Sequence, residues 1–226
     1  VYLSNPELFY VPKQAALGLF NDGYGDALYL VEERPDGKVW KNAAHFGYPD
    51  DVIGTPDLLD KIKNDQDHRV DYAFVVRNRL FDVLIGDWDR HDDQWRWAEF
   101  EDGKKHVYRP IPRDRDQAFS RYDGLLIGTL RRFSPALQPL RDYGTPPNKW
   151  TNYGARYFDP TFLSGASWED WEAEARHVQE KLTDEVIESA FQNNWPAQFL
   201  ALDSDFVMKE LKKRRDNLLM LSLIHI

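Results

Sequence analysis

The sequence predicts an α+β fold in which strands come first and helices fill the second half of the chain. Three observations lead to this class: short apolar and aromatic runs between turn residues over the first 50 positions, an apolar helical segment followed by a hairpin, and capped helical segments from Ser167 onward. With 226 residues, of which 42% are hydrophobic and 14% aromatic, the chain can bury a sizeable core.

Two strands and one helix are expected in the first part of the chain. Residues 8–11 and 27–31 are short apolar runs typical of strands, and residues 32–37 then form a linker and turn. Thr55 is expected to cap a helix that runs to about Asn64, because a proline and an acidic residue follow it directly.

The helix expected over residues 70–85 is the best-defined element. Its apolar positions fall near helical spacing, and Gly86 is suited to end it in a left-handed conformation. We expect it to be the central buried helix. A hairpin follows, with strands at 97–100 and 106–109 that turn at 101–103.

The second half of the chain is expected to be irregular at first and helical afterwards. Residues 135–148 are loop-like, with two consecutive prolines that block regular structure. Ser167 and Asp170 form a capping pair for one helix, and Thr183 starts another. A last helix is expected from Asp205 to about Leu223.

Charge and composition exclude several classes of partner and site. A net charge of -9 and an isoelectric point near 5.2 argue against nucleic acid as a partner. The basic run at 209–215 is expected to be a solvated helix face. The chain has no cysteine, which excludes disulfides, zinc–thiolate sites and thiol nucleophiles, and no run reaches the roughly 18 apolar residues of a membrane span. Because the sequence starts at Val1 without a methionine, we expect a segment of a longer protein, and its compartment stays open.

Carboxylates are concentrated in two places, residues 86–95 and residues 113–119. In the first, four aspartates and a histidine occupy seven consecutive positions, and two more aspartates return about twenty residues later. Clustered acids repel one another, so they are typical of sites where a cation or strong donors lie between them. The intervening hairpin brings both clusters together, an arrangement that a magnesium–nucleotide site needs.

The two clusters read DRHDDQW from Asp89 and DRDQAF from Asp114. They resemble the catalytic and metal-binding loops of atypical kinases, namely the type II phosphatidylinositol 4-kinases, the Fam20 kinases of the secretory pathway and the HipA-like bacterial kinases. The resemblance covers residues 27–119, about 40% of the chain. It implies a protein-kinase-like fold, with a partial small lobe and hinge over 1–34 and a mainly helical large lobe over 35–226.

By position, the resemblance implies roles for single residues. Asp89 would be the catalytic acid that orients the acceptor, Gln94 the first metal ligand and Asp114 the main one. Asp116 stays open between a second metal ligand and a member of an ion pair. The hinge that holds adenine through its backbone would consist of Leu30, Val31, Glu32 and Glu33.

The implied function is phosphoryl transfer that depends on ATP and on Mg2+ or Mn2+. Its acceptor stays open between a protein hydroxyl, a lipid head group and a small molecule. The sequence departs from the family pattern at two points. Gln94 stands where an Asn or Glu is usual, and residues 1–30 contain neither a glycine-rich phosphate loop nor a lysine in the context of a strand, since Lys13 lies in a Val-Pro-Lys-Gln context.

Several of these residues also have structural interpretations. Asp87 is expected to end the preceding helix, and His91 to form a hydrogen bond within its loop. Asp92 and Asp93 are expected to be solvated turn residues, whereas Asp114 could instead form a buried salt bridge with a neighbouring arginine. The tryptophans at positions 88, 95 and 97 are expected to be core residues.

Two other function classes stay open. Residues 86–90 are similar to the Gly-Asp-x-x-Asp-Arg signature of calcineurin-like metallophosphoesterases, with a spacing one residue short, so the chain could be an accessory or C-terminal domain of a large bacterial protein of that class. The other class is a non-catalytic interaction module that keeps the kinase-like fold. The six histidines lie mostly on separate expected elements and show no zinc spacing.

Overall fold

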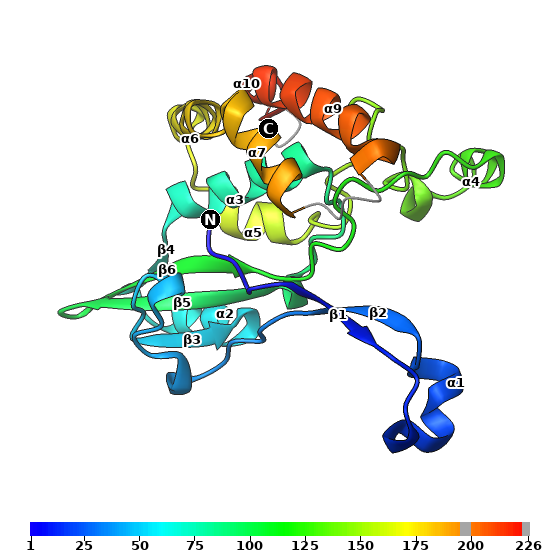
Figure 1. Ribbon diagram of the computed structural model, residues 1–226. Coiled ribbons are helices and arrows are strands. Elements are labelled where there is room, and N and C mark those ends of the chain that lie inside the picture. The colour runs from blue at the N-terminus through cyan, green and yellow to red at the C-terminus, as the bar shows by residue number, and fades with distance from the viewer. Residues whose placement is uncertain (195–199, 223–226) are drawn as a thin grey trace.

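The fold consists of a two-stranded ribbon at the N-terminus, a four-stranded sheet and a layer of helices (Figure 1). The computed structural model describes residues 1–194 and 200–222. It confirms the α+β class. Within those residues, no helix is both long enough and apolar enough to cross a bilayer.

The N-terminal ribbon consists of the two predicted strands, β1 (Glu7–Val11) and β2 (Ala27–Val31), which pair in antiparallel register. A 3-10 turn and the short α1 (Asn21–Tyr24) connect the two strands. The ribbon extends away from the sheet and the helices (Figure 1), so its apolar side chains are exposed; Leu8 is 62% exposed and Phe9 59%.

The second sheet has the strand order β3-β5-β6-β4. Its centre is the expected hairpin, β5 (Trp95–Asp102) and β6 (Lys105–Pro112), and its edges are β3 (Asp51–Gly54) and the parallel β4 (His68–Val70). These two short edge strands were not expected from the sequence. One face packs against the helices through Trp95 and Trp97, both fully buried, and the other packs against the 3-10 turns at residues 38–46.

The helix α3 (Tyr72–Ile85) lies at the centre of the larger core, as expected, with nine buried residues. The other helices are α2 (Thr55–Asn64), α4 (Leu125–Leu130), α5 (Phe158–Leu163), α6 (Trp168–Lys181), α7 (Asp184–Asn194), α9 (Asp205–Asp216) and α10 (Leu218–Ser222). Ser167 and Asp170 form the expected capping box of α6, and the Thr183 hydroxyl accepts from the backbone N–H of Val186 at the start of α7.

Three local expectations are wrong. Gly54, not Thr55, takes the cap position of α2, because the Thr55 hydroxyl instead donates to the Asp92 carbonyl oxygen at 3.0 Å and accepts from the Trp97 indole at 3.1 Å. The last helix breaks at Asn217 into α9 and α10, and its expected end at Leu223 lies outside the described residues.

The basic run at 209–215 is the third, because one of its members is not solvated. Arg214 is only 7% exposed, and its guanidinium donates to the carbonyl oxygens of Val83 and Tyr143. It also lies over the Tyr143 ring, 4.0 Å from its centre. This arginine therefore joins α9 to the end of α3.

Candidate functional site at the two acidic loops

The end of α3 delivers the first acidic loop. Gly86 adopts a left-handed conformation with φ of 77°, and its N–H caps the carbonyl oxygens of Asp82 and Val83. An added Cβ at this position would lie 2.8 Å from the Tyr143 ring. Only glycine therefore fits both the backbone angle and the space, and the chain leaves the helix directly into residues 87–94.

The hairpin brings the second acidic loop to the same end of the sheet. In its register Trp95 lies opposite Pro112, so the residue before β5 and the residue after β6 are neighbours. The backbone N–H of Arg113 donates to the carbonyl oxygen of Gln94 at 2.9 Å. The two loops are thus joined by main-chain pairing that continues beyond the strands.

Arg90 connects the two loops through its side chain. Its side chain is fully buried and donates to the Gln94 amide oxygen at 2.9 Å and to the Arg113 carbonyl oxygen at 2.7 Å. It also forms ion pairs of 3.3 Å with both Asp82 and Asp87. A single guanidinium therefore satisfies groups from α3, from the first loop and from the second loop.

Ion pairs with little solvent exposure link the two loops to α3 and α5. We call these residues the buried ion network: Arg79, Asp82, Asp87, Arg90, Arg115 and Asp159. Burial acts to raise the pKa of Asp82, but the three arginines around it together lower that pKa below its usual value. Asp87 has a weaker set of partners. Burial raises the pKa of Asp87 to about 7, and one of its carboxylate oxygens has no hydrogen-bond partner.

Three acids of the two loops, Asp89, Asp114 and Asp116, together with Glu32 after β2 are what we call the acidic surface. Glu32, just after β2, accepts from the Asp114 backbone N–H at 3.1 Å and pairs with the Arg113 guanidinium at the same distance. Burial raises the pKa of Asp114, and the negative charges of Asp116 and Glu32 raise it further. Arg113 and Arg90 act to lower that pKa, but the net effect is a raised pKa, so the charges of these acids are not fully compensated.

Asp89 and Asp116 both lie near enough to Tyr122 to act on its pKa. Both carboxylates add to the effect of burial in raising the pKa of Tyr122, whose hydroxyl donates to the Gln117 amide oxygen at 2.6 Å. Gly154 lies directly on the backbone of the Asp89 loop, since an added Cβ would come 2.3 Å from the Trp88 carbonyl oxygen. The sequence did not single out Tyr122 or Gly154, and a lone Tyr or Gly in a loop carries no local signal that would do so.

The predicted metal ligands Gln94 and Asp114 are brought together, with 3.5 Å between the Gln94 amide nitrogen and an Asp114 carboxylate oxygen. The Gln94 amide must present its oxygen to Arg90, which can only donate, so its nitrogen faces Asp114. In this orientation Gln94 is a hydrogen-bond donor to Asp114. Asp114 itself has a φ of 53°, a strained angle for a residue other than glycine.

Of the four expected hinge residues, Leu30 and Val31 form the end of β2 and Glu32 reaches the second acidic loop. Glu33 instead pairs with His45 at 2.9 Å. A cavity of about 210 Å³ connects the ribbon to the loop, and it is lined by Leu3, Ser4, Pro6, Leu30, Glu32, Pro112, Arg113, Asp114 and Arg115. Part of the expected hinge thus borders the expected metal loop.

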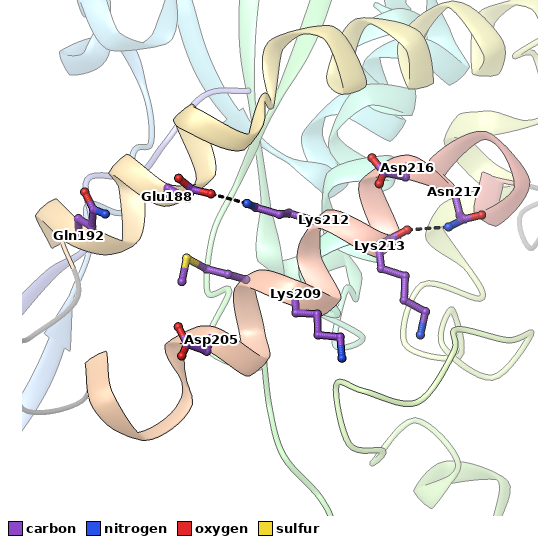
Figure 2. Close-up of a pocket in the computed structure, with 9 residues that line it drawn as sticks. Glu188, Gln192, Asp205, Lys209, Lys212, Lys213, Asp216 and Asn217 are labelled. Atoms are coloured by element: carbon purple, nitrogen blue, oxygen red, sulfur yellow. Dashed lines mark hydrogen bonds and ion pairs between the residues drawn. The ribbon is translucent and has the colours of Figure 1, made fainter.

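Two other hollows do not compete with this site. The groove in Figure 2, of about 630 Å³, lies between α7 and α9, and its central Lys212 points to Glu188 and forms an ion pair of 2.6 Å with it. A second hollow of about 370 Å³ is lined mainly by apolar side chains, including Phe81, Phe119 and Phe191. The first has its charges largely balanced and the second has few polar groups, so neither combines acids with a shortage of cations.

The chain was compared with known proteins, and no family model, curated protein or solved structure matches it.

Proposed function

We propose that this chain is a kinase-like phosphotransferase that uses ATP with magnesium or manganese. The observation that carries the proposal is the joining of two acidic loops, at one end of a hairpin, into a surface where Asp114 has a raised pKa and acidic neighbours. Such a surface favours binding of a divalent cation, because the cation would relieve the repulsion among the carboxylates.

The acidic surface fits magnesium through its carboxylates rather than through Gln94. Hard cations prefer carboxylate oxygens, and Asp114 and Asp116 supply them, whereas the Gln94 oxygen already accepts from Arg90. A bound magnesium ion would neutralise charge on the phosphates. Asp114, with Asp116, would hold that ion, and the ribbon with residues 30–33 would hold the base.

Asp89 is the proposed group that orients and deprotonates the acceptor hydroxyl. It is half-buried and lies two residues after buried Asp87. A carboxylate in that role must lie within hydrogen-bond reach of the hydroxyl. The acceptor class stays open between protein, lipid head group and small molecule, because the described pockets carry no feature that selects one of them.

Thermal melting with and without Mg-ATP tests the proposal. At about a hundredfold excess over Kd, nucleotide binding would add about 2.7 kcal/mol to the free energy of unfolding, or about 5–10 °C in Tm for a chain of this size. Asp114→Asn should abolish the metal-dependent shift. Asp89→Asn should keep the shift and abolish transfer of the γ-phosphate.

Asp102→Asn is the matched control, because this exposed aspartate lies at the far end of β5. It should behave as the wild type in both assays. A shift that survives in Asp114→Asn would contradict the metal assignment. No response to Mg-ATP in the wild type, or in a version extended before Val1, would favour the non-catalytic interaction module, and phosphoester hydrolysis without nucleotide would favour the phosphoesterase class.

A further inference from the structure

Two histidines that lie 38 positions apart meet on the four-stranded sheet. His68 on β4 is the direct register partner of His106 on β6, and their rings stack with 4.3 Å between centres. The two histidines lie on separate strands, and the pairing of those strands, which the sequence did not indicate, brings them together. Residues paired directly across two strands have side chains on the same face, so the two imidazoles share one face of the sheet.

The same face carries a carboxylate and a phenol. Glu99 on β5 lies opposite Tyr108 on β6, and Tyr108 is two residues after His106. Glu99 is 3% exposed, and its carboxylate accepts from the His106 Nδ1 at 2.6 Å. One ligand atom from each of His68, Glu99 and His106 can be chosen so that all three lie within 4.8 Å of one another.

A phenol stands beside the three possible ligands. The Tyr108 hydroxyl lies 2.8 Å from the His68 Nδ1, and which of the two groups donates depends on the tautomer of His68. With its proton on Nδ1, His68 donates to the phenol oxygen and keeps the Nε2 lone pair for a metal ion.

A cation also borders the cluster. The second carboxylate oxygen of Glu99 lies 3.6 Å from the Lys61 ammonium on α2. A neutral imidazole and an oriented carboxylate are the forms in which these side chains bind metal.

We propose that His68, Glu99 and His106 bind one zinc ion, which clamps the three-residue edge strand β4 to β6 and β5. Two histidines and one glutamate are a donor set that zinc accepts, with water in the fourth position. Magnesium disfavours imidazole, so this site differs in chemistry from the acidic surface. It also stands independently of the proposed phosphotransferase function.

Small movements would complete the coordination. Tetrahedral zinc with bonds of about 2.0–2.1 Å needs ligand atoms about 3.3 Å apart. The ion would take the place of the proton between the His106 Nδ1 and Glu99, which widens their 2.6 Å contact, and the neutral ring would carry its one proton on Nε2 instead. The two rings now lie within 14° of parallel, so the half-buried His68 must tilt until its Nε2 points at the ion.

Zinc titration of the full chain, without an affinity tag and stripped by a chelator, tests the site. Competition with a chromophoric chelator at pH 7.5 should give one zinc per chain. His68→Ala and His106→Ala should each weaken binding by about 100-fold or more, and Tyr108→Phe, which removes only the hydroxyl on His68, by about tenfold. Cobalt in place of zinc should give the visible absorption of a four-coordinate site, and this should be lost in the histidine variants.

His177→Ala, at a half-buried histidine on α6, is the control for histidine removal away from the cluster and should bind zinc as the wild type does. Circular dichroism of each variant shows whether it is folded. Zinc binding that is absent in the wild type, or equal in the wild type and in folded His68→Ala and His106→Ala, would overturn the proposal.

Discussion

The buried ion network and the acidic surface meet at Arg90 and Gln94, yet they hold their carboxylates in opposite ways. In the network, Asp82 is fully buried among three arginines that lower its pKa. On the surface, the exposed Asp114 has a raised pKa, because partial desolvation raises it and the neighbouring acids Asp116 and Glu32 raise it further. Thus the more deeply buried acid is the one whose charged form is better stabilised.

This difference separates structural acids from candidate functional acids. A carboxylate paired with several arginines has its charge satisfied within the chain, and its removal leaves those cations buried and unpaired. A carboxylate surrounded by other acids has no such compensation and favours an external cation. The four variants below test this division, from the largest expected effect to the smallest.

Asp82→Asn should have the largest effect on stability. The Asp82 carboxylate accepts from Arg79 and Arg115 at 2.8 Å and lies 3.3 Å from Arg90, and an amide would turn a donor toward one of these cations. We expect the free energy of unfolding to fall by about 3–5 kcal/mol, measured by urea denaturation. Asp93→Asn, at a residue 71% exposed, should change it by less than about 0.5 kcal/mol. Equal losses of stability in Asp82→Asn and Asp93→Asn would contradict the assignment of Asp82 as a structural acid.

Asp87→Asn should change how stability depends on pH. The folded-state pKa of Asp87, about 7, lies above its ordinary value of 3.8, so the folded protein holds this proton more tightly than the unfolded chain. The resulting stabilisation is complete below about pH 4 and is lost as the pH rises through 7.

Asparagine imitates the protonated form at every pH. The variant should therefore gain about 2–4 kcal/mol relative to the wild type between pH 4.5 and 7.5, measured by urea denaturation at both values. A constant difference between the two proteins would show that Asp87 is charged throughout and belongs with Asp82.

Gly154→Ala should affect the acidic surface more than the network. The new methyl group would lie 2.3 Å from the Trp88 carbonyl oxygen and 3.0 Å from the backbone nitrogen of Arg90, so the Asp89 loop must shift. We expect a loss of about 1–3 kcal/mol in stability and a larger proportional loss in phosphoryl transfer than in Mg-ATP binding. Gly124→Ala, where an added Cβ meets open space, is the control.

Asp116→Asn should have the smallest effect on stability, below about 0.5 kcal/mol. It removes a charge that raises the pKa of Asp114, so that pKa should fall toward its ordinary value. Carboxylate chemical shifts followed through a pH titration would measure the change. An unmoved Asp114 pKa would show that Asp116 does not contribute to it, and the like-charge argument for a cation at these two residues would lose its support.

The sequence predicted the elements that depend on local signals. The apolar spacing and Gly86 predicted α3, the alternation around residues 101–103 predicted the hairpin, and Ser167 with Asp170 predicted the start of α6. The edge strands β3 and β4 were not predicted, because they have only four and three residues and exist by pairing with the hairpin. The order of the two acidic loops also followed from the sequence, since a hairpin returns the chain to its start.

The partner of each charge was decided only by the tertiary structure. Arg79 pairs with Asp159, 80 residues away, and Glu32 bonds to the Asp114 N–H, 82 residues away. His68 and His106 likewise meet only because β4 adds to β6 in parallel. Capping, turns and periodicity act over a few residues and can be read along the chain, whereas burial and ion pairing depend on which distant elements pack together. That physical difference is why the sequence indicated the acidic loops, and only the fold separated the compensated Asp82 from the uncompensated Asp114.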